Sequence, residues 1–174
     1  MKKVTFSIRD ARSDELSYLI KIYQAAFSKH NIFQRKEKEI LEYLQQTQHK
    51  NKAAGGGYLV ALAGNQIVGA LLVRQEAEDI SGKHARWKYN HLAVAVPFQR
   101  KGIGTALLQA ADKKVLAAMK VRKINTAKVE IGVAENEQGA AAFYINNGFK
   151  VEGKLHSHYR FNEMVYVMGK ELKI

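Results

Sequence analysis

A short basic turn with two glycines, Gln99-Arg100-Lys101-Gly102-Ile103-Gly104, carries the clearest chemical signal in the sequence. Glycine lacks a Cβ, so Gly102 and Gly104 let the backbone approach a ligand closely and let successive N–H groups point into one concavity. A helix that begins at this turn adds N–H groups without partners and the positive end of its dipole. The turn therefore predicts a site for a phosphate group.

A strand and a helix must flank this turn to position it. Apolar residues alternate at Leu92, Val94 and Val96, which predicts a strand. After the turn, apolar residues recur at helical spacing and predict a helix from about Gly102 to Met119. A P-loop would read G-x-x-x-x-G-K-[ST], and a Rossmann turn would need a third glycine where Leu107 stands. The turn therefore matches neither nucleotide-binding motif.

The other elements follow from the same two periods. Alternating apolar residues predict strands over residues 4–9, 58–62, 66–73, 128–133, 150–159 and 165–172. Helical spacing predicts one helix capped by Ser13 and further helices over residues 35–48 and 139–146. The chain is 174 residues long, has no Pro/Gly/Ser linker and has no cysteine. We therefore expect a single domain over residues 1–174 without disulfides.

A second segment follows the predicted strand at Val129-Glu130-Ile131-Gly132-Val133, where a short helix carries Phe143-Tyr144 and leads to Asn147-Gly148-Phe149. Together, the two segments resemble motifs A and B of the GNAT superfamily of acetyl-CoA-dependent N-acetyltransferases. The Q/R-x-x-G-x-G/A signature is met by Gln99, Gly102 and Gly104. The Tyr-x-x-x-Gly-Phe signature is met by Tyr144, Gly148 and Phe149.

The resemblance implies an α/β (α+β) fold with a mixed, mostly antiparallel sheet of about seven strands and about four helices. In that family, a parallel strand pair splays apart at the centre of the sheet, and acetyl-CoA is expected to enter there. Such an enzyme transfers the acetyl group from acetyl-CoA to a primary amine of a small molecule, amino acid or peptide, by direct attack in a ternary complex. The implied coenzyme contacts are Leu92, Ala93, Val94, Val96, Gln99, Arg100, Lys101, Gly102, Ile103, Gly104, Thr105, Asn136 and Phe143.

The resemblance also implies roles for titratable residues. Tyr144 is the candidate general acid that protonates the departing thiolate, although it could instead be a core aromatic residue. His91 lies where family members often carry a base, and Glu130 on the neighbouring strand is the alternative. Ordered water could also take the proton from the amine. Residues 27–33 are expected to line the acceptor cleft.

The charge and the remaining patterns limit other functions. The formal net charge is +12, from 28 Lys and Arg against 16 Asp and Glu, but the basic residues form no long run. Solvated faces explain this charge better than a polyanion surface, so nucleic acid is not expected as a partner. His156 and His158 lack the further ligands that a metal site needs. No signal peptide or membrane span is evident, which predicts a cytoplasmic protein.

The sequence is compatible with two further alternatives. An acyl-CoA-binding sensor or partner-binding module without turnover is the alternative function. The exposed C-terminal strands could pair between subunits in a homodimer.

Overall fold

The computed structural model describes residues 5–137, 139–159 and 162–174. Its seven strands follow the order β1-β2-β3-β4-β5-β7-β6, in which β4 and β5 are parallel. Together with four α-helices, they confirm the expected mixed α/β fold. The chain forms two compact units, Met1–Arg74 with His91–Val115 and Gln75–Asn90 with Leu116–Ile174. The single domain over residues 1–174 stays a prediction.

The elements follow the predicted periods closely. The strands are β1 (Ser7–Asp10), β2 (Gly57–Ala63), β3 (Gln66–Glu78), β4 (His84–Val94), β5 (Thr126–Ala134), β6 (Lys150–Tyr159) and β7 (Glu163–Lys173). The helices are α1 (Leu16–Ala26), α2 (Glu37–Lys52), α3 (Ile103–Arg122) and α4 (Ala140–Asn146), and short 3-10 turns precede α1 and follow β4. The first residue of the strand predicted over residues 4–9 lies outside the described residues.

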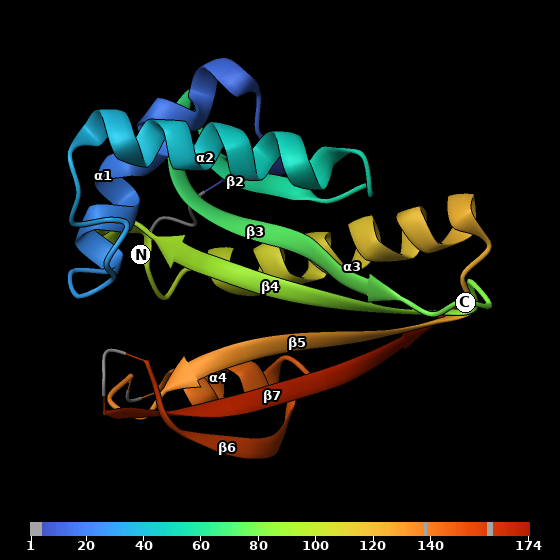
Figure 1. Ribbon diagram of the computed structural model, residues 1–174. Helices are drawn as coiled ribbons and strands as arrows, with labels where there is room; N and C mark the ends of the chain where they lie inside the picture. The colour runs from blue at the N-terminus through green and yellow to red at the C-terminus, as the bar shows by residue number, and fades with distance from the viewer. Residues whose placement is uncertain (1–4, 138, 160–161) are drawn as a thin grey trace. The chain divides into compact units, whose positions relative to one another are not determined.

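In the first unit, the strands β2 and β3 carry apolar residues on both faces. Alternate positions, among them Val60, Ala70 and Leu72, pack into one cluster with residues of α1 and α2 such as Leu19 and Leu44. Figure 1 shows α2 running along these strands. Burial of each large apolar side chain contributes about 1.5–3 kcal/mol, which fixes the helices on this face.

A buried glutamine links α2 to two other elements of the first unit. The side-chain amide of Gln48 donates to the carbonyl of Ala11 at 3.1 Å, and its oxygen accepts the N–H of Tyr58 at 2.7 Å. Both main-chain groups would otherwise lack a partner in the interior. Gln48 therefore fixes the position of α2 against the ends of β1 and β2.

The first helical turn begins differently from the prediction, because Ser13 is not its cap. The carboxylate of Glu15 accepts the N–H of Arg12 at 2.9 Å instead. It also receives two hydrogen bonds from the guanidinium of Arg9, at 2.7 and 2.6 Å. These bonds, that of Arg9 first, lower the pKa of Glu15 to about 2.

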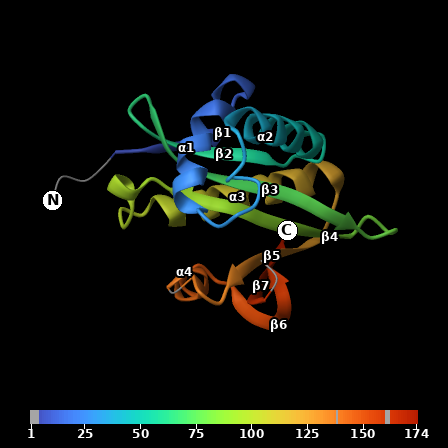
Figure 2. The same cartoon turned by 60° about the vertical axis from the view of Figure 1, so that its left-hand side comes forward.

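In the second unit, β4 pairs with β5 in parallel and β5, β7 and β6 pair antiparallel. Figure 2 shows α4 beside the β6–β7 hairpin. The β4–β5 register runs from His84 opposite Thr126 to Lys88 opposite Glu130, although β5 continues to Ala134. The buried side chains of this unit include Trp87, Tyr89, Val129, Ile131 and Phe149. In the described part of the chain, no helix has the length and apolar character that crossing a membrane requires.

Candidate active site

The glycine turn between β4 and α3 is open at its centre. Arg100 and Gly102 have φ values of +59° and +81°, which lie in the left-handed region. A Cβ added at Gly102 would meet no atom within 4 Å, so protein atoms do not fill the space beside it. From Arg100 to Thr105, no main-chain N–H has a hydrogen-bond acceptor among the described residues. These donors at the start of α3 form a surface suited to an anion.

Side chains of the same segment hold the turn in this shape. The amide of Gln99 donates to the carbonyl of Val94 at 2.9 Å, which closes the turn onto the end of β4. The ammonium of Lys101 donates to the carbonyl of Pro97 at 2.8 Å and lies 5.5 Å from the centre of the Phe98 ring. In this structure, the Gln99 amide therefore supports the backbone of the turn.

The strand before the turn is shorter than predicted. Val96 lies in the 3-10 turn Val96–Phe98 and is 73% exposed, so its expected place in the strand is wrong. Pro97 explains this end, because proline has no N–H to donate to a neighbouring strand. Near the end of β4, a Cβ added to Gly69 of the strand β3 would lie 2.9 Å from the carbonyl oxygen of Ala93. Glycine is therefore required there for the close approach of β4.

His91 lies in β4 within a cluster of aromatic rings, and its own φ is +54°. Its ring centre lies 5.0 Å from that of Phe33 and 5.5 Å from that of His30. The other rings around it, at 5.7–6.2 Å, are Tyr23, Phe27 and Tyr43. Its Nδ1 atom is enclosed and has no hydrogen-bond partner among the described residues. Burial first, then the charges of His30 and Arg74, lowers the pKa of His91 to about 3.

This aromatic cluster was only partly predictable. The segment expected to line the acceptor cleft supplies Phe27, His30 and Phe33, and Phe33 is fully buried. No pattern in the sequence linked Tyr43 of α2 or Tyr23 of α1 to His91. The helical spacing of Tyr43 from Ile40 was a usable signal, because residues three apart share a helix face.

Tyr144 lies in α4 of the second unit. Its ring packs against those of Phe143 and Phe149, with centres 5.2 and 5.7 Å away. Burial, and secondly the charge of Glu137, raises the pKa of Tyr144 well above its usual range. Its hydroxyl therefore stays protonated at neutral pH, and none of the described residues hydrogen-bonds to it.

The remaining candidates of the second unit have polar partners. The carboxylate of Glu130 pairs with the guanidinium of Arg86 at 3.2 Å, and the two side chains are 21% and 52% exposed. The amide of Asn136 donates to Glu163 at 2.8 Å. Within residues 5–137, 139–159 and 162–174, no three His, Asp or Glu side chains group in a way that could hold a metal ion. The assigned roles of these residues stay predictions.

The sequence between residues 54 and 151 matches the family described as acetyltransferase (GNAT) domain. The chain belongs to the GNAT acetyltransferases. It is 27% identical to an N-alpha-acetyltransferase of Saccharolobus solfataricus and 29% identical to one of Sulfurisphaera tokodaii. Both alignments cover 96% of this chain and 93% of the relative.

A solved structure with the same fold is Arabidopsis thaliana Naa50 in complex with the bisubstrate analogue CoA-Ac-MVNAL. The TM-score is 0.70 at 22% identity, over 96% of this chain and 99% of that chain. This GNAT protein is therefore an acetyl-transferring enzyme, as the sequence predicted.

Proposed function

We propose that this GNAT enzyme acetylates the α-amino group at the N-terminus of peptides or proteins, with acetyl-CoA as the donor. The two relatives similar over nearly the whole chain are N-alpha-acetyltransferases. The observation that carries the proposal is the open row of N–H groups from Arg100 to Thr105, which find no acceptor in the described part of the chain and suit the diphosphate of the coenzyme.

The coenzyme binds mainly through the main chain in this proposal. The diphosphate accepts hydrogen bonds from the N–H groups of the turn, and the exposed Arg100 and Lys101 attract its negative charge. The pantetheine arm follows the main chain of Leu92 to Val94, and the N–H of Val94 polarises the thioester carbonyl. Asn136 and Phe143 are proposed as further contacts.

The chemistry is a direct transfer between two bound substrates. The neutral amine attacks the thioester carbon, so that a C–N bond forms and the C–S bond breaks. The hydroxyl of Tyr144 gives its proton to the departing thiolate and recovers one from solvent. The hydroxyl is protonated at neutral pH, so its proton is available when the thiolate forms, although burial makes Tyr144 a weaker acid than a free tyrosine.

The proton released by the amine goes to Glu130 or to water in contact with it. His91 was the other candidate, but a pKa of about 3 leaves it a poor proton acceptor at neutral pH. The variants Glu130→Gln and His91→Gln distinguish these two candidate proton acceptors. Loss of kcat at neutral pH in Glu130→Gln alone supports Glu130, and loss in His91→Gln alone supports His91.

The test of the proposed function is a thiol-release assay with acetyl-CoA and a panel of amino acids, polyamines, aminoglycosides and peptides with free N-termini. We expect turnover with peptides and its strong reduction in Tyr144→Phe. Tyr18→Phe is the matched control, because Tyr18 is 67% exposed on α1. Tight coenzyme binding without turnover on any amine would contradict the proposal and favour a sensor.

Two finer points are proposed alongside this function. A cytoplasmic location is expected, and fluorescence microscopy or fractionation of the expressed protein tests it. A homodimer could form through β6, where Val151 and Leu155 are exposed, and sedimentation velocity tests it.

A further inference from the structure

A pocket lies within the second unit, on one face of its sheet. Its volume is about 290 Å³, and the residues that line it are Arg86, Lys88, Glu130, Gly132, Leu155, His158, Val165 and Val167. Alternate residues of a strand point to the same face, which places Arg86 with Lys88 on β4 and Glu130 with Gly132 on β5. Gly132 contributes no side chain to this lining.

The volume limits what the pocket can hold. Pockets for small molecules in proteins occupy about 300–1,000 Å³, so this one lies at the small end. It has room for about one amino-acid side chain. Leu155, Val165 and Val167 give it an apolar wall, and the two cations and Glu130 give it a charged end.

The charged residues Arg86, Lys88 and Glu130 of the pocket differ in whether they have an ion-pair partner. Glu130 is paired with Arg86, although Lys88 is its direct neighbour in the strand register. Lys88 is half-buried, and no described residue accepts a hydrogen bond from its ammonium or forms an ion pair with it. By contrast, Lys128 on the same strand face as Glu130 is paired with Glu152. A lysine side chain that packs in a pocket while its ammonium has no partner among the described residues can pair with an anion that enters the pocket.

We propose that this pocket recognises an acidic side chain of the acceptor peptide, with the ammonium of Lys88 as the partner of its carboxylate. The inference rests on the proposed function, in which Glu130 takes the proton of the amine. Neighbouring strands lie about 4.8 Å apart, so Lys88 stands one strand away from the proposed proton acceptor. An Asp or Glu at the first or second position of the acceptor then reaches Lys88, and its methylene groups contact the apolar wall.

The experiment compares kcat/KM for peptides that differ only by Glu, Gln or Lys at each of the first two positions. The wild-type enzyme should prefer Glu about 5- to 10-fold, as expected for one charge-assisted contact in a partly buried site. Lys88→Gln should reduce the preference to about 1- to 2-fold. Lys88→Glu should reverse it in favour of Lys at the same position.

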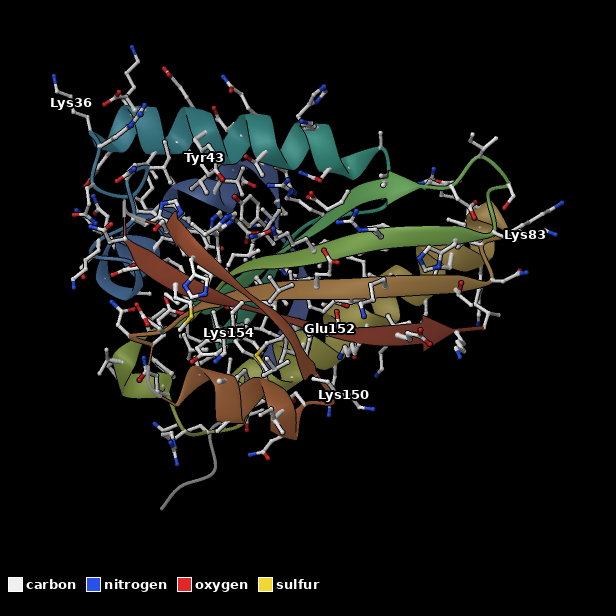
Figure 3. All side chains as sticks on the ribbon, turned by 60° about the horizontal axis from the view of Figure 1, so that its bottom comes forward. Lys36, Tyr43, Lys83, Lys150, Glu152 and Lys154 are labelled. Carbon is white, nitrogen blue, oxygen red and sulfur yellow. The ribbon has the colours of Figure 1, made fainter. Side chains whose placement is uncertain are left out.

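Lys83→Gln is the control for the loss of one positive charge. Lys83 is exposed at the start of β4, and Figure 3 shows it at the far end of that strand from the labelled β6 residues Lys150 and Lys154. This variant should keep the wild-type preference for Glu. A preference that falls equally in both variants would show general charge attraction and would overturn the inference, as would a wild-type enzyme that does not distinguish Glu from Gln.

A second readout keeps the inference separate from the proposed function. Fluorescence anisotropy measures the binding of the same labelled peptides to the CoA-bound enzyme without turnover. If no peptide is acetylated, the proposed function fails. The pocket is still supported if binding favours Glu in the wild type and loses that preference in Lys88→Gln. It is overturned if binding does not depend on Lys88.

Discussion

Replacing Gly102 with alanine tests the coenzyme turn with the smallest possible change. The φ of +81° at Gly102 lies in a region that residues with a Cβ rarely adopt. Holding alanine there costs about 1–2 kcal/mol. Since the added Cβ would meet no atom within 4 Å, steric overlap adds nothing to this cost. The turn can escape the strain only by changing its backbone conformation.

A changed backbone would turn the N–H groups away from the diphosphate. Each hydrogen bond to a charged group contributes about 1.5–3 kcal/mol. Loss of one such bond therefore raises the Kd for acetyl-CoA roughly 10- to 100-fold. Titration calorimetry with CoA measures this change directly, without an acceptor amine.

Gly64→Ala is the matched control for Gly102→Ala. Gly64 lies in the turn between β2 and β3, has a φ of +59° and would also place its Cβ in open space. Both variants should lose about 1–2 kcal/mol of stability, or about 2–8 °C in Tm. Only Gly102→Ala should lose affinity. An unchanged Kd in Gly102→Ala, or an equal loss in Gly64→Ala, would refute the role of the turn.

Three further predictions follow from single side chains. Tyr144→Phe should lower kcat about 100-fold or more because the general acid is lost, with CoA affinity by calorimetry nearly unchanged; equal kcat would remove Tyr144 from the mechanism. Gln48→Leu should lower the free energy of unfolding in urea by about 2–4 kcal/mol, because Ala11 and Tyr58 lose buried hydrogen-bond partners; a loss under roughly 0.5 kcal/mol would contradict this. The low pKa of His91 means that the unfolded chain takes up a proton below about pH 6.5 and the folded chain does not until about pH 3. The free energy of unfolding should therefore fall as the pH is lowered through this window, by about 2 kcal/mol between pH 7 and pH 5. The His91→Gln variant should lose less stability over the same range.

The sequence predicted the elements well because their periods are local. The hairpin of β2 and β3 and the final pair β6 and β7 appear where alternation placed them. Helix α2 begins at Glu37 rather than earlier, and Glu39 accepts the N–H of Lys36 at its start. The sequence placed that boundary incorrectly, because several charged residues near it could begin a helix.

The candidate site was predictable only where it is local. The turn around Gly102 follows from a few adjacent residues, and the structure has it open as expected. The rings around His91 come from α1, α2 and the segment between them, and no local pattern links them to β4. The pairing of Glu130 with Arg86 also joins residues far apart in the sequence, because it depends on the parallel register of β4 and β5. Contacts between residues far apart in the chain could be identified only once the tertiary fold was known.

His91 combines two features that cost folding free energy, a left-handed backbone and an enclosed nitrogen that no described residue hydrogen-bonds. Asparagine or glycine tolerates this backbone more easily. Random mutagenesis selected only for heat resistance should therefore replace this histidine readily. Selection that also demands growth dependent on acetylation would show whether the enzyme keeps a less stable residue for the sake of its activity.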